Sequence, residues 1–259
     1  GSYPINASGA VDQNYAITHL DGTLTIGTSI LRIRANNAAR LYGASNPTFS
    51  VFYEGFIGDD DENVLDTPVT LTTPATSSSP VGQYPITPGG ATDSNYTLVF
   101  IDGTLDVTPA SLRIIARNTS RAYGSSNPPF AVNYEGFLNG DDADDLDTTP
   151  TVVTTAIRTS PVGPYPIIPS AAADVNYFIS YENGNLDVIN ATVSMTANVQ
   201  SRPYGSGNPT LSVTYDGFVN GEDETILDAL LEVTTTALPD SPVGMYPITV
   251  SGATAPNYT

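Results

Sequence analysis

The feature that most constrains this chain is an internal repeat with a step of 81 residues, kept without insertion or deletion. Four landmarks recur at this step: Y-P-I, Y-G, Y-[ED]-G-F and S-P-V-G. The Y-P-I landmark opens at Tyr3, Tyr84, Tyr165 and Tyr246. Because a fixed period means that one structural unit is copied, we expect a tandem array whose neighbouring copies stack on one another.

Each unit is expected to be mostly β. Apolar and polar residues alternate at Leu31, Ile33 and Ala35, which is the period of a strand with one buried face. The same alternation returns around Val51, in residues 71–75, at Y-P-I, in residues 96–100 and in residues 105–107. The sequence therefore predicts about six short strands per unit.

Two local patterns predict how strands are connected. The acidic segment after Phe56 should begin a short helix of two turns, because carboxylates offset the positive end of a helix. Asp102-Gly103 lies between two alternating runs, and Asp21-Gly22 and Asn183-Gly184 repeat it. This pair predicts a two-residue hairpin with a positive φ at the glycine.

The repeat sets the expected domain boundaries. Residues 29–109, 110–190 and 191–259 form three units, the third without its closing hairpin, and residues 1–28 supply the last strands of a preceding unit. We expect one longer covalent chain with further repeats on both sides; strand exchange between subunits is the alternative. Connections of a few residues that contain proline predict a semi-rigid array.

Composition excludes several classes of function. The net charge is −19, from 27 acidic residues against eight arginines and no lysine. Nucleic acids and anionic membrane surfaces would repel such a chain. There is no cysteine, and no apolar stretch approaches the roughly 20 residues that span a membrane.

No residue pattern indicates catalysis. The single histidine, His19, occupies the register of Phe100 and Tyr181, so we interpret it as filling an aromatic position on a strand. A catalytic triad needs a base beside its nucleophile, and the other copies have no such base. We therefore expect that the chain is not an enzyme.

The acidic segments are the only candidates for a metal site. They lack the glycine and glutamate of an EF-hand loop, so a solvated turn is the simpler interpretation and weak Ca²⁺ binding the alternative. No other cofactor is expected. The candidate ligands are Asp59, Asp60, Asp61, Glu62, Asp141, Asp142, Asp144, Asp145, Glu222, Asp223 and Glu224.

Two further sets of polar residues are candidates for contacts or modification. Arg40, Arg121 and Arg202 share one register, and either contact the next domain or pair locally with a carboxylate or a tyrosine ring. Acceptor motifs for N-glycosylation occur at Asn6, Asn95, Asn118, Asn190 and Asn257.

The motifs Y-G-[AS]-x-N-P, Y-[ED]-G-F, S-P-V-G-x-Y-P-I and N-Y…D-G-T-L-x-V resemble the bacterial MBG domain (YGX type), and the resemblance covers essentially the whole chain. It implies an extracellular module of exported surface proteins, including adhesin-like ones, with a β-grasp-like fold. It brings no catalytic residue and no ligand pocket with it.

These observations favour the shaft of a cell-surface fibre or adhesin, acting as a semi-rigid spacer. Its expected partners are further repeats of the same chain, together with lateral or end-to-end self-association. The alternative is a module that binds carbohydrate or protein. Such a module would need an aromatic platform on an exposed strand face.

Overall fold

The computed structural model describes residues 1–229 and 231–259. The chain divides into two compact units. The first comprises Gly1–Ala110 with Val175–Tyr177, and the second comprises Ser111–Asp174 with Phe178–Thr259. Strands predominate throughout, which confirms the prediction of a mostly β tandem repeat.

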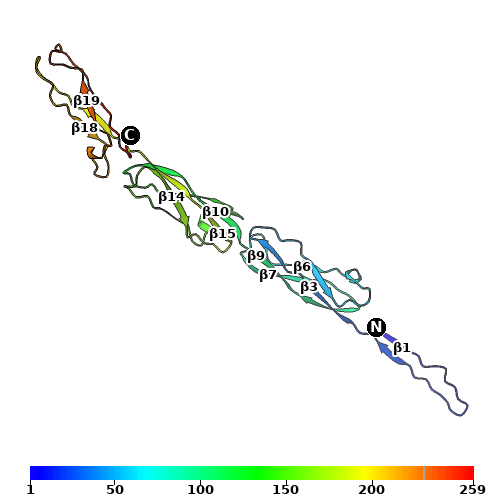
Figure 1. Ribbon diagram of the computed structural model, residues 1–259. Coiled ribbons are helices and arrows are strands. Elements are labelled where there is room, and N and C mark those ends of the chain that lie inside the picture. The colour runs from blue at the N-terminus through cyan, green and yellow to red at the C-terminus, as the bar shows by residue number, and fades with distance from the viewer. Residues whose placement is uncertain (230) are drawn as a thin grey trace. The chain divides into compact units, whose positions relative to one another are not determined.

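The first repeat is a sandwich of two sheets. Its strands are β3 (Ser29–Ala35), β4 (Ala38–Leu41), β5 (Val51–Glu54), β6 (Thr70–Thr72), β7 (Gly82–Gly89), β8 (Tyr96–Ile101) and β9 (Gly103–Thr108). One sheet has the order β5-β3-β8 and the other β4-β9-β7-β6. In Figure 1, β3, β7 and β9 run alongside one another within this repeat.

The core lies between the two sheets. Along β3 every second residue is buried, so Leu31 and Ile33 point inward. From the other sheet come Ile86 on β7 and Leu105 on β9, and all four side chains are 0% exposed. Burying each contributes about 1.5–3 kcal/mol relative to exposure, so the alternation seen in the sequence accounts for the packing of the sandwich.

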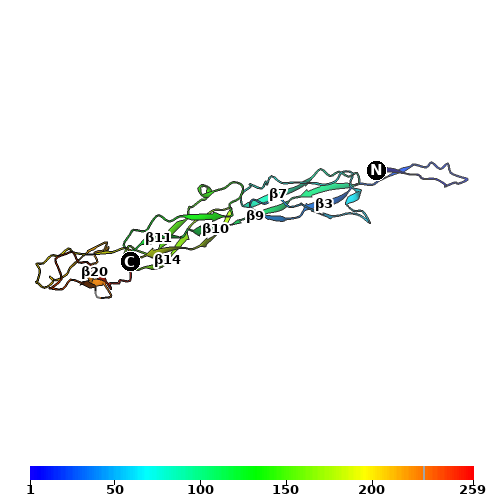
Figure 2. The ribbon, with the colours of Figure 1, turned by 90° about the horizontal axis from the view of Figure 1, so that it is seen from above.

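The second repeat has the same topology. Its strands are β10 (Ala110–Ala116), β11 (Thr119–Ala122), β12 (Val132–Glu135), β13 (Thr151–Thr154), β14 (Gly163–Ser170), β15 (Tyr177–Glu182) and β16 (Gly184–Ile189). The sheet orders are β12-β10-β15 and β11-β16-β14-β13. Figure 2 shows β10, β11 and β14 close together in this repeat.

The remaining strands form pairs. In the third repeat, β17 (Ser194–Ala197) pairs with β18 (Val213–Asp216), and β19 (Glu232–Thr235) with β20 (Ile248–Ser251). Near the N-terminus, β1 (Ser2–Ile5) pairs with β2 (Gly22–Thr25). All three pairs are antiparallel.

The prediction of six strands per unit missed one strand. β4 and its counterpart β11 run parallel to the last strand of their repeat. In β4 the inward position is held by Arg40, which is buried, instead of by an apolar residue. Because the sequence of β4 therefore lacks the apolar alternation of a strand, its pattern gave no signal.

The predicted two-turn helix is a single 3-10 turn. The three copies are η1 (Glu62–Val64), η2 (Ala143–Asp145) and η3 (Glu224–Ile226). Asp61 caps η1, but Leu65 already has extended backbone angles, and Pro68 disfavours a helical conformation for the residue before it. Within the described residues these 3-10 turns are the only helical elements, so each repeat consists almost entirely of strands and loops. The β-grasp-like arrangement that the family resemblance implies stays a prediction.

The predicted hairpin at Asp102-Gly103 is also wrong. β8 and β9 belong to different sheets, so the chain crosses the sandwich here. Gly103 does not have a positive φ. It is nevertheless required, because a Cβ at this position would lie 2.6 Å from the backbone oxygen of Ala35. A Cβ at Gly184 would likewise lie 2.6 Å from the backbone oxygen of Ala116.

Candidate functional site: the junction between repeats

Three of the repeated motifs meet where the second repeat joins the third, inside the second unit. Tyr123 of the Y-G motif contacts Tyr258 of the Asn-Tyr pair edge to face, with ring centroids 5.7 Å apart and planes at 81°. Phe218 of the Y-D-G-F motif contacts the same Tyr258 at 5.4 Å and 77°. This is the geometry that aromatic pairs prefer.

The aromatic contacts belong to a continuous apolar cluster. Tyr123 and Val188 of the second repeat, Ala191 and Tyr258 are all buried in it. Val162, Tyr165, Val193, Phe218, Val219, Ile226 and Ala255 pack against them. The hydrophobic core of the second repeat therefore continues into the third.

A single carboxylate binds both tyrosines. The hydroxyl of Tyr123 donates to Oε1 of Glu222 at 2.7 Å, and the hydroxyl of Tyr258 donates to Oε2 at 2.5 Å. Burial, as the larger cause, and the hydrogen bond to Glu222 raise the pKa of Tyr258 to about 12. For Tyr123 the hydrogen bond to Glu222 is the larger cause and burial the smaller, and both raise the pKa. Hydrogen bonds to an ionised acceptor are stronger than neutral ones, so this pair joins two repeats firmly.

Backbone groups complete the junction. The amide of Val162, in the S-P-V-G motif, donates to Oδ1 of Asn257 at 3.0 Å. The amide of Ala191 donates to the backbone oxygen of Asn257 at 2.9 Å. The S-P-V-G and Asn-Tyr motifs thus recognise each other across the junction.

Gly124, the second residue of the Y-G motif, is needed because of the next repeat. Its φ is +77°, and a Cβ here would lie 2.3 Å from Cγ2 of Val219. Its carbonyl accepts a hydrogen bond from Nε of Arg158 at 2.6 Å. A larger residue would be strained and would push Val219 out of the cluster.

The first unit contains the equivalent contacts. Tyr42 meets Tyr177 edge to face at 5.6 Å and 81°. The amide of Val81 donates to Oδ1 of Asn176 at 3.0 Å, and the amide of Ala110 donates to its backbone oxygen at 2.9 Å. Both sets of residues are separated by the 81-residue step, so the junction is itself a repeated feature.

The three arginines of one register bind inside their own repeat. Arg121 is 6% exposed, its Nε donates to Oδ1 of Asn127 at 2.7 Å, and its Nη2 donates to the backbone oxygen of Ile157 at 2.5 Å. Arg40 and Arg202 make the equivalent bonds. Their hydrogen-bond partners are amide and carbonyl oxygens instead of the expected carboxylates, and a contact with the next domain stays a prediction.

The acidic segments have two structural roles, of which the sequence predicted the one at the start of the helical turn and missed the bond to a tyrosine. Asp60 accepts a hydrogen bond from the hydroxyl of Tyr96 at 2.6 Å, as Glu222 does from Tyr258. Asp61, Asp142 and Asp223 cap the 3-10 turns. Bonds from the hydroxyl and amide of Thr225 lower the pKa of Asp223.

No group of three or more His, Cys, Asp or Glu side chains in the described residues is arranged to hold a metal ion. Calcium binding by the acidic segments stays a prediction.

The glycosylation motifs differ in their surroundings. Asn6, Asn95 and Asn118 are exposed. Asn190 donates from Nδ2 to the backbone oxygen of Tyr258 at 3.1 Å, and Asn257 is part of the junction. Glycosylation at any of these asparagines stays a prediction.

His19 is exposed in this structure. Its interpretation as a residue that fills an aromatic position on a strand stays a prediction.

A cavity of about 520 Å³ opens in the third repeat, lined by Ala197, Ala237 and Ile248 among others. In the second repeat the corresponding residues, Ala116, Ala156 and Ile167, pack against Leu186 of β16. The cavity therefore corresponds to core space that a strand fills in the second repeat.

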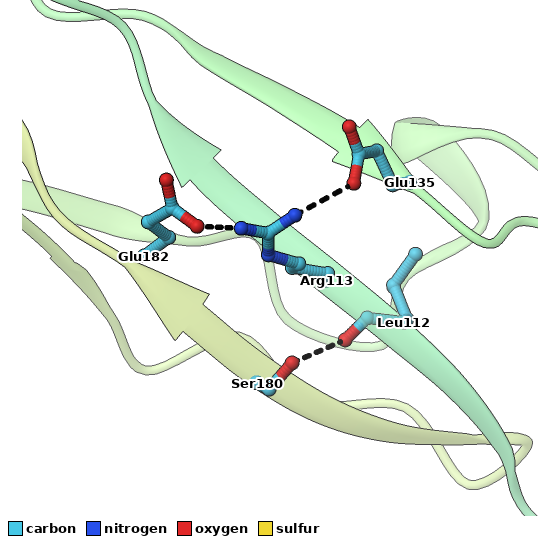
Figure 3. A network of polar contacts seen from close by, with 5 residues as sticks. All are labelled: Leu112, Arg113, Glu135, Ser180 and Glu182. Atoms are coloured by element: carbon cyan, nitrogen blue, oxygen red, sulfur yellow. Dashed lines mark hydrogen bonds and ion pairs between the residues drawn. The ribbon is translucent and has the colours of Figure 1, made fainter.

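The outer face of one sheet carries an ionic network (Figure 3). Arg113 on β10 lies between Glu135 on β12 and Glu182 on β15, with 3.0 Å from Nη1 to Oε2 of Glu135. Beside it, the hydroxyl of Ser180 donates to the backbone oxygen of Leu112 at 3.4 Å. All three charged side chains are about half exposed, so the network adds little stability.

The junction roles of Gly124, Val219 and Glu222 were missed from the sequence. Repetition of Y-G and of an acid at the 81-residue step was visible, but only the fold brings these positions together.

A family model, the MBG domain (YGX type), matches residues 31–106, 112–187 and 193–259. No curated protein matches the chain. Within the described residues, no helix has the length and apolar character required to cross a membrane.

Proposed function

Because the chain belongs to the MBG domain (YGX type) family, we propose that its repeats form the shaft of an extracellular, cell-surface protein and act as a semi-rigid spacer. The single observation that carries this proposal is the shared carboxylate of Glu222, which binds Tyr123 of one repeat and Tyr258 of the next. In a spacer, the most strictly repeated residues are those that fix one repeat against another.

The repeated motifs support this proposal over a binding module. Tyr123, Gly124, Val162 and Asn257 are all used within the junction. A module that binds a ligand in every copy would instead repeat its exposed residues.

The two most exposed phenylalanines do not repeat. Phe52 is 60% exposed and Phe178 72% exposed. The 81-residue step places Asn133 in the register of Phe52, and Thr97 in that of Phe178. Phe100 and Tyr181 do share one register, at 38% and 39% exposed, so an aromatic platform repeated between the first two repeats would rest on one partly exposed ring in each.

Spin labels test the spacer directly. The chain has no cysteine, so the double variant Asn133→Cys/Asp240→Cys carries one label in the second repeat and one in the third. Pulsed electron spin resonance should give one narrow distance distribution. Adding Tyr123→Ala should broaden it, because the junction loses its aromatic contact and the bond to Glu222.

Tyr181→Ala is the control, since this partly exposed tyrosine donates its hydroxyl to the backbone oxygen of Ala172 in its own repeat. It should leave the distribution narrow. A broad distribution in the chain without Tyr123→Ala would contradict the spacer.

A further inference from the structure

Arginines are scarce in this acidic chain, so their placement is informative. Four of them donate hydrogen bonds from the guanidinium group to carbonyl or amide oxygens of the chain: Arg40, Arg121, Arg158 and Arg202. Arg113 is ion-paired. Among the described residues, the arginines for which the structure gives no side-chain hydrogen bond or ion pair are Arg32, Arg34 and Arg117.

Two of these lie on one sheet face of the first repeat. Arg32 and Arg34 alternate with buried residues along β3, so both point to the outer face of the sheet β5-β3-β8. The register places Phe52 on one side of Arg34 and Ile101 on the other. Val99 stands beside Arg32.

We call this surface, formed by Ile30, Arg32, Arg34, Phe52, Val99 and Ile101, the arginine face. Its apolar members include Phe52, 60% exposed, and Ile30, 51% exposed. The one acidic neighbour in the register is Glu54, opposite Arg32. The arginine face therefore combines exposed apolar side chains with two arginines. Only Arg32 has a carboxylate directly opposite it in the strand register.

In the second repeat, the arginine at the position of Arg32 is neutralised by two carboxylates. Arg113, which matches Arg32 in register, is held between Glu135 and Glu182 (Figure 3). In the first repeat, Ile101 stands in the place of Glu182. The third repeat has Ser194 there and no cation. Charge and apolar area are thus exposed together on the first repeat.

A partner for this face must offer carboxylates beside apolar side chains. The acidic loop of the same repeat, residues 57–64, has this composition. Ile57 is 61% exposed and Val64 41% exposed, and Asp59 and Glu62 are exposed between them. The loop follows β5, which carries Phe52, so the arginine face and the loop are neighbours in the chain.

We propose that two copies of this chain associate side by side, with the acidic loop of each copy on the arginine face of the other. A two-fold axis allows this reciprocal contact, because one surface then contains both halves of the interaction. At physiological salt the repulsion between two chains of net charge −19 is screened beyond about 8 Å, whereas contacting Arg–carboxylate pairs are screened much less. The proposal goes beyond the spacer function, which requires no second chain.

Sedimentation velocity of the 259-residue chain over a concentration series tests the association. We expect a reversible dimer at 0.15 M salt, weakened at 1 M salt. The variant Arg32→Gln/Arg34→Gln should raise the dissociation constant about tenfold or more, as the loss of two charged pairs implies. The control Arg117→Gln removes an exposed arginine outside the arginine face and should leave the constant unchanged.

Charge exchange identifies the partner surface. Chains with Arg34→Glu and chains with Asp59→Arg/Glu62→Arg should each dimerise weakly alone and form a mixed dimer together. A monomer at all concentrations up to about 1 mM, or a dimer insensitive to Arg32→Gln/Arg34→Gln, would overturn the proposal. So would a monomeric chain that is retained on immobilised polygalacturonate through the same two arginines, because the occupant would then be an acidic polysaccharide.

Discussion

Tyr123 and Tyr258 lie in different repeats, yet their rings meet edge to face at 5.7 Å and their hydroxyls bind the two oxygens of the Glu222 carboxylate. The second and third repeats therefore share part of one core. Substitutions at the junction should therefore change the stability of the chain and its dependence on pH.

Gly124→Val should destabilise the junction by about 2 kcal/mol or more. A side chain at φ +77° is strained, and its Cβ would overlap Cγ2 of Val219. Thermal unfolding of the chain should show a lower melting temperature. Gly207→Val is the control, because nothing lies within 4 Å of a Cβ there. An equal loss of stability in both variants would contradict the close approach at Gly124.

Gly103→Ala should destabilise the first repeat by about 1–3 kcal/mol, because its Cβ would stand 2.6 Å from the backbone oxygen of Ala35. The matched control is Gly22→Ala, in the same motif position, where the nearest atom is Cβ of Ile5 at 3.7 Å. Differential scanning calorimetry should show a lower melting temperature for the first variant only. No change for Gly103→Ala would show that the two sheets can separate locally to admit a methyl group.

Arg121→Leu should destabilise the second repeat by about 2–4 kcal/mol. It would leave Oδ1 of Asn127 and the backbone oxygen of Ile157 without their donor in a part-buried region. Urea unfolding measures the loss. Arg117→Leu, at an exposed position, should change the free energy of unfolding by less than about 0.5 kcal/mol.

The junction should weaken at alkaline pH. The pKa of Tyr258 is raised from 10.0 to about 12, so its protonated form is favoured in the folded state. The stabilisation from this group is therefore fully present below pH 10 and is lost as the pH rises from about 10 to about 12. Urea unfolding across this range should show a smaller decline for Tyr258→Phe, which cannot ionise. An identical decline would mean that burial and the bond to Glu222 do not raise the pKa of Tyr258 in the folded state.

The sequence predicted the strands with strong apolar alternation, and the structure places β3, β7 and β9 accordingly. It could not predict β4, because the inward residue of that strand is Arg40, whose acceptors come from distant segments. It also misread Asp102-Gly103 as a hairpin. A turn signal reports that the chain changes direction, but sheet pairing depends on contacts far apart in the sequence.

The junction was predictable only in part. Repetition identified Tyr123, Gly124 and Asn257 as positions that every copy needs. The contacts of Glu222 with two tyrosines depend on how the acidic loop meets the preceding repeat, which no local pattern encodes.

The central claim is that repeated residues join neighbouring repeats. A double-mutant cycle between Tyr123 of the second repeat and Glu222 of the third tests it most directly. The free energies of unfolding of Tyr123→Phe, Glu222→Gln and the double variant should reveal a coupling of about 1 kcal/mol or more. Effects that add within about 0.3–0.5 kcal/mol would contradict the claim, because independent residues cannot hold two repeats together.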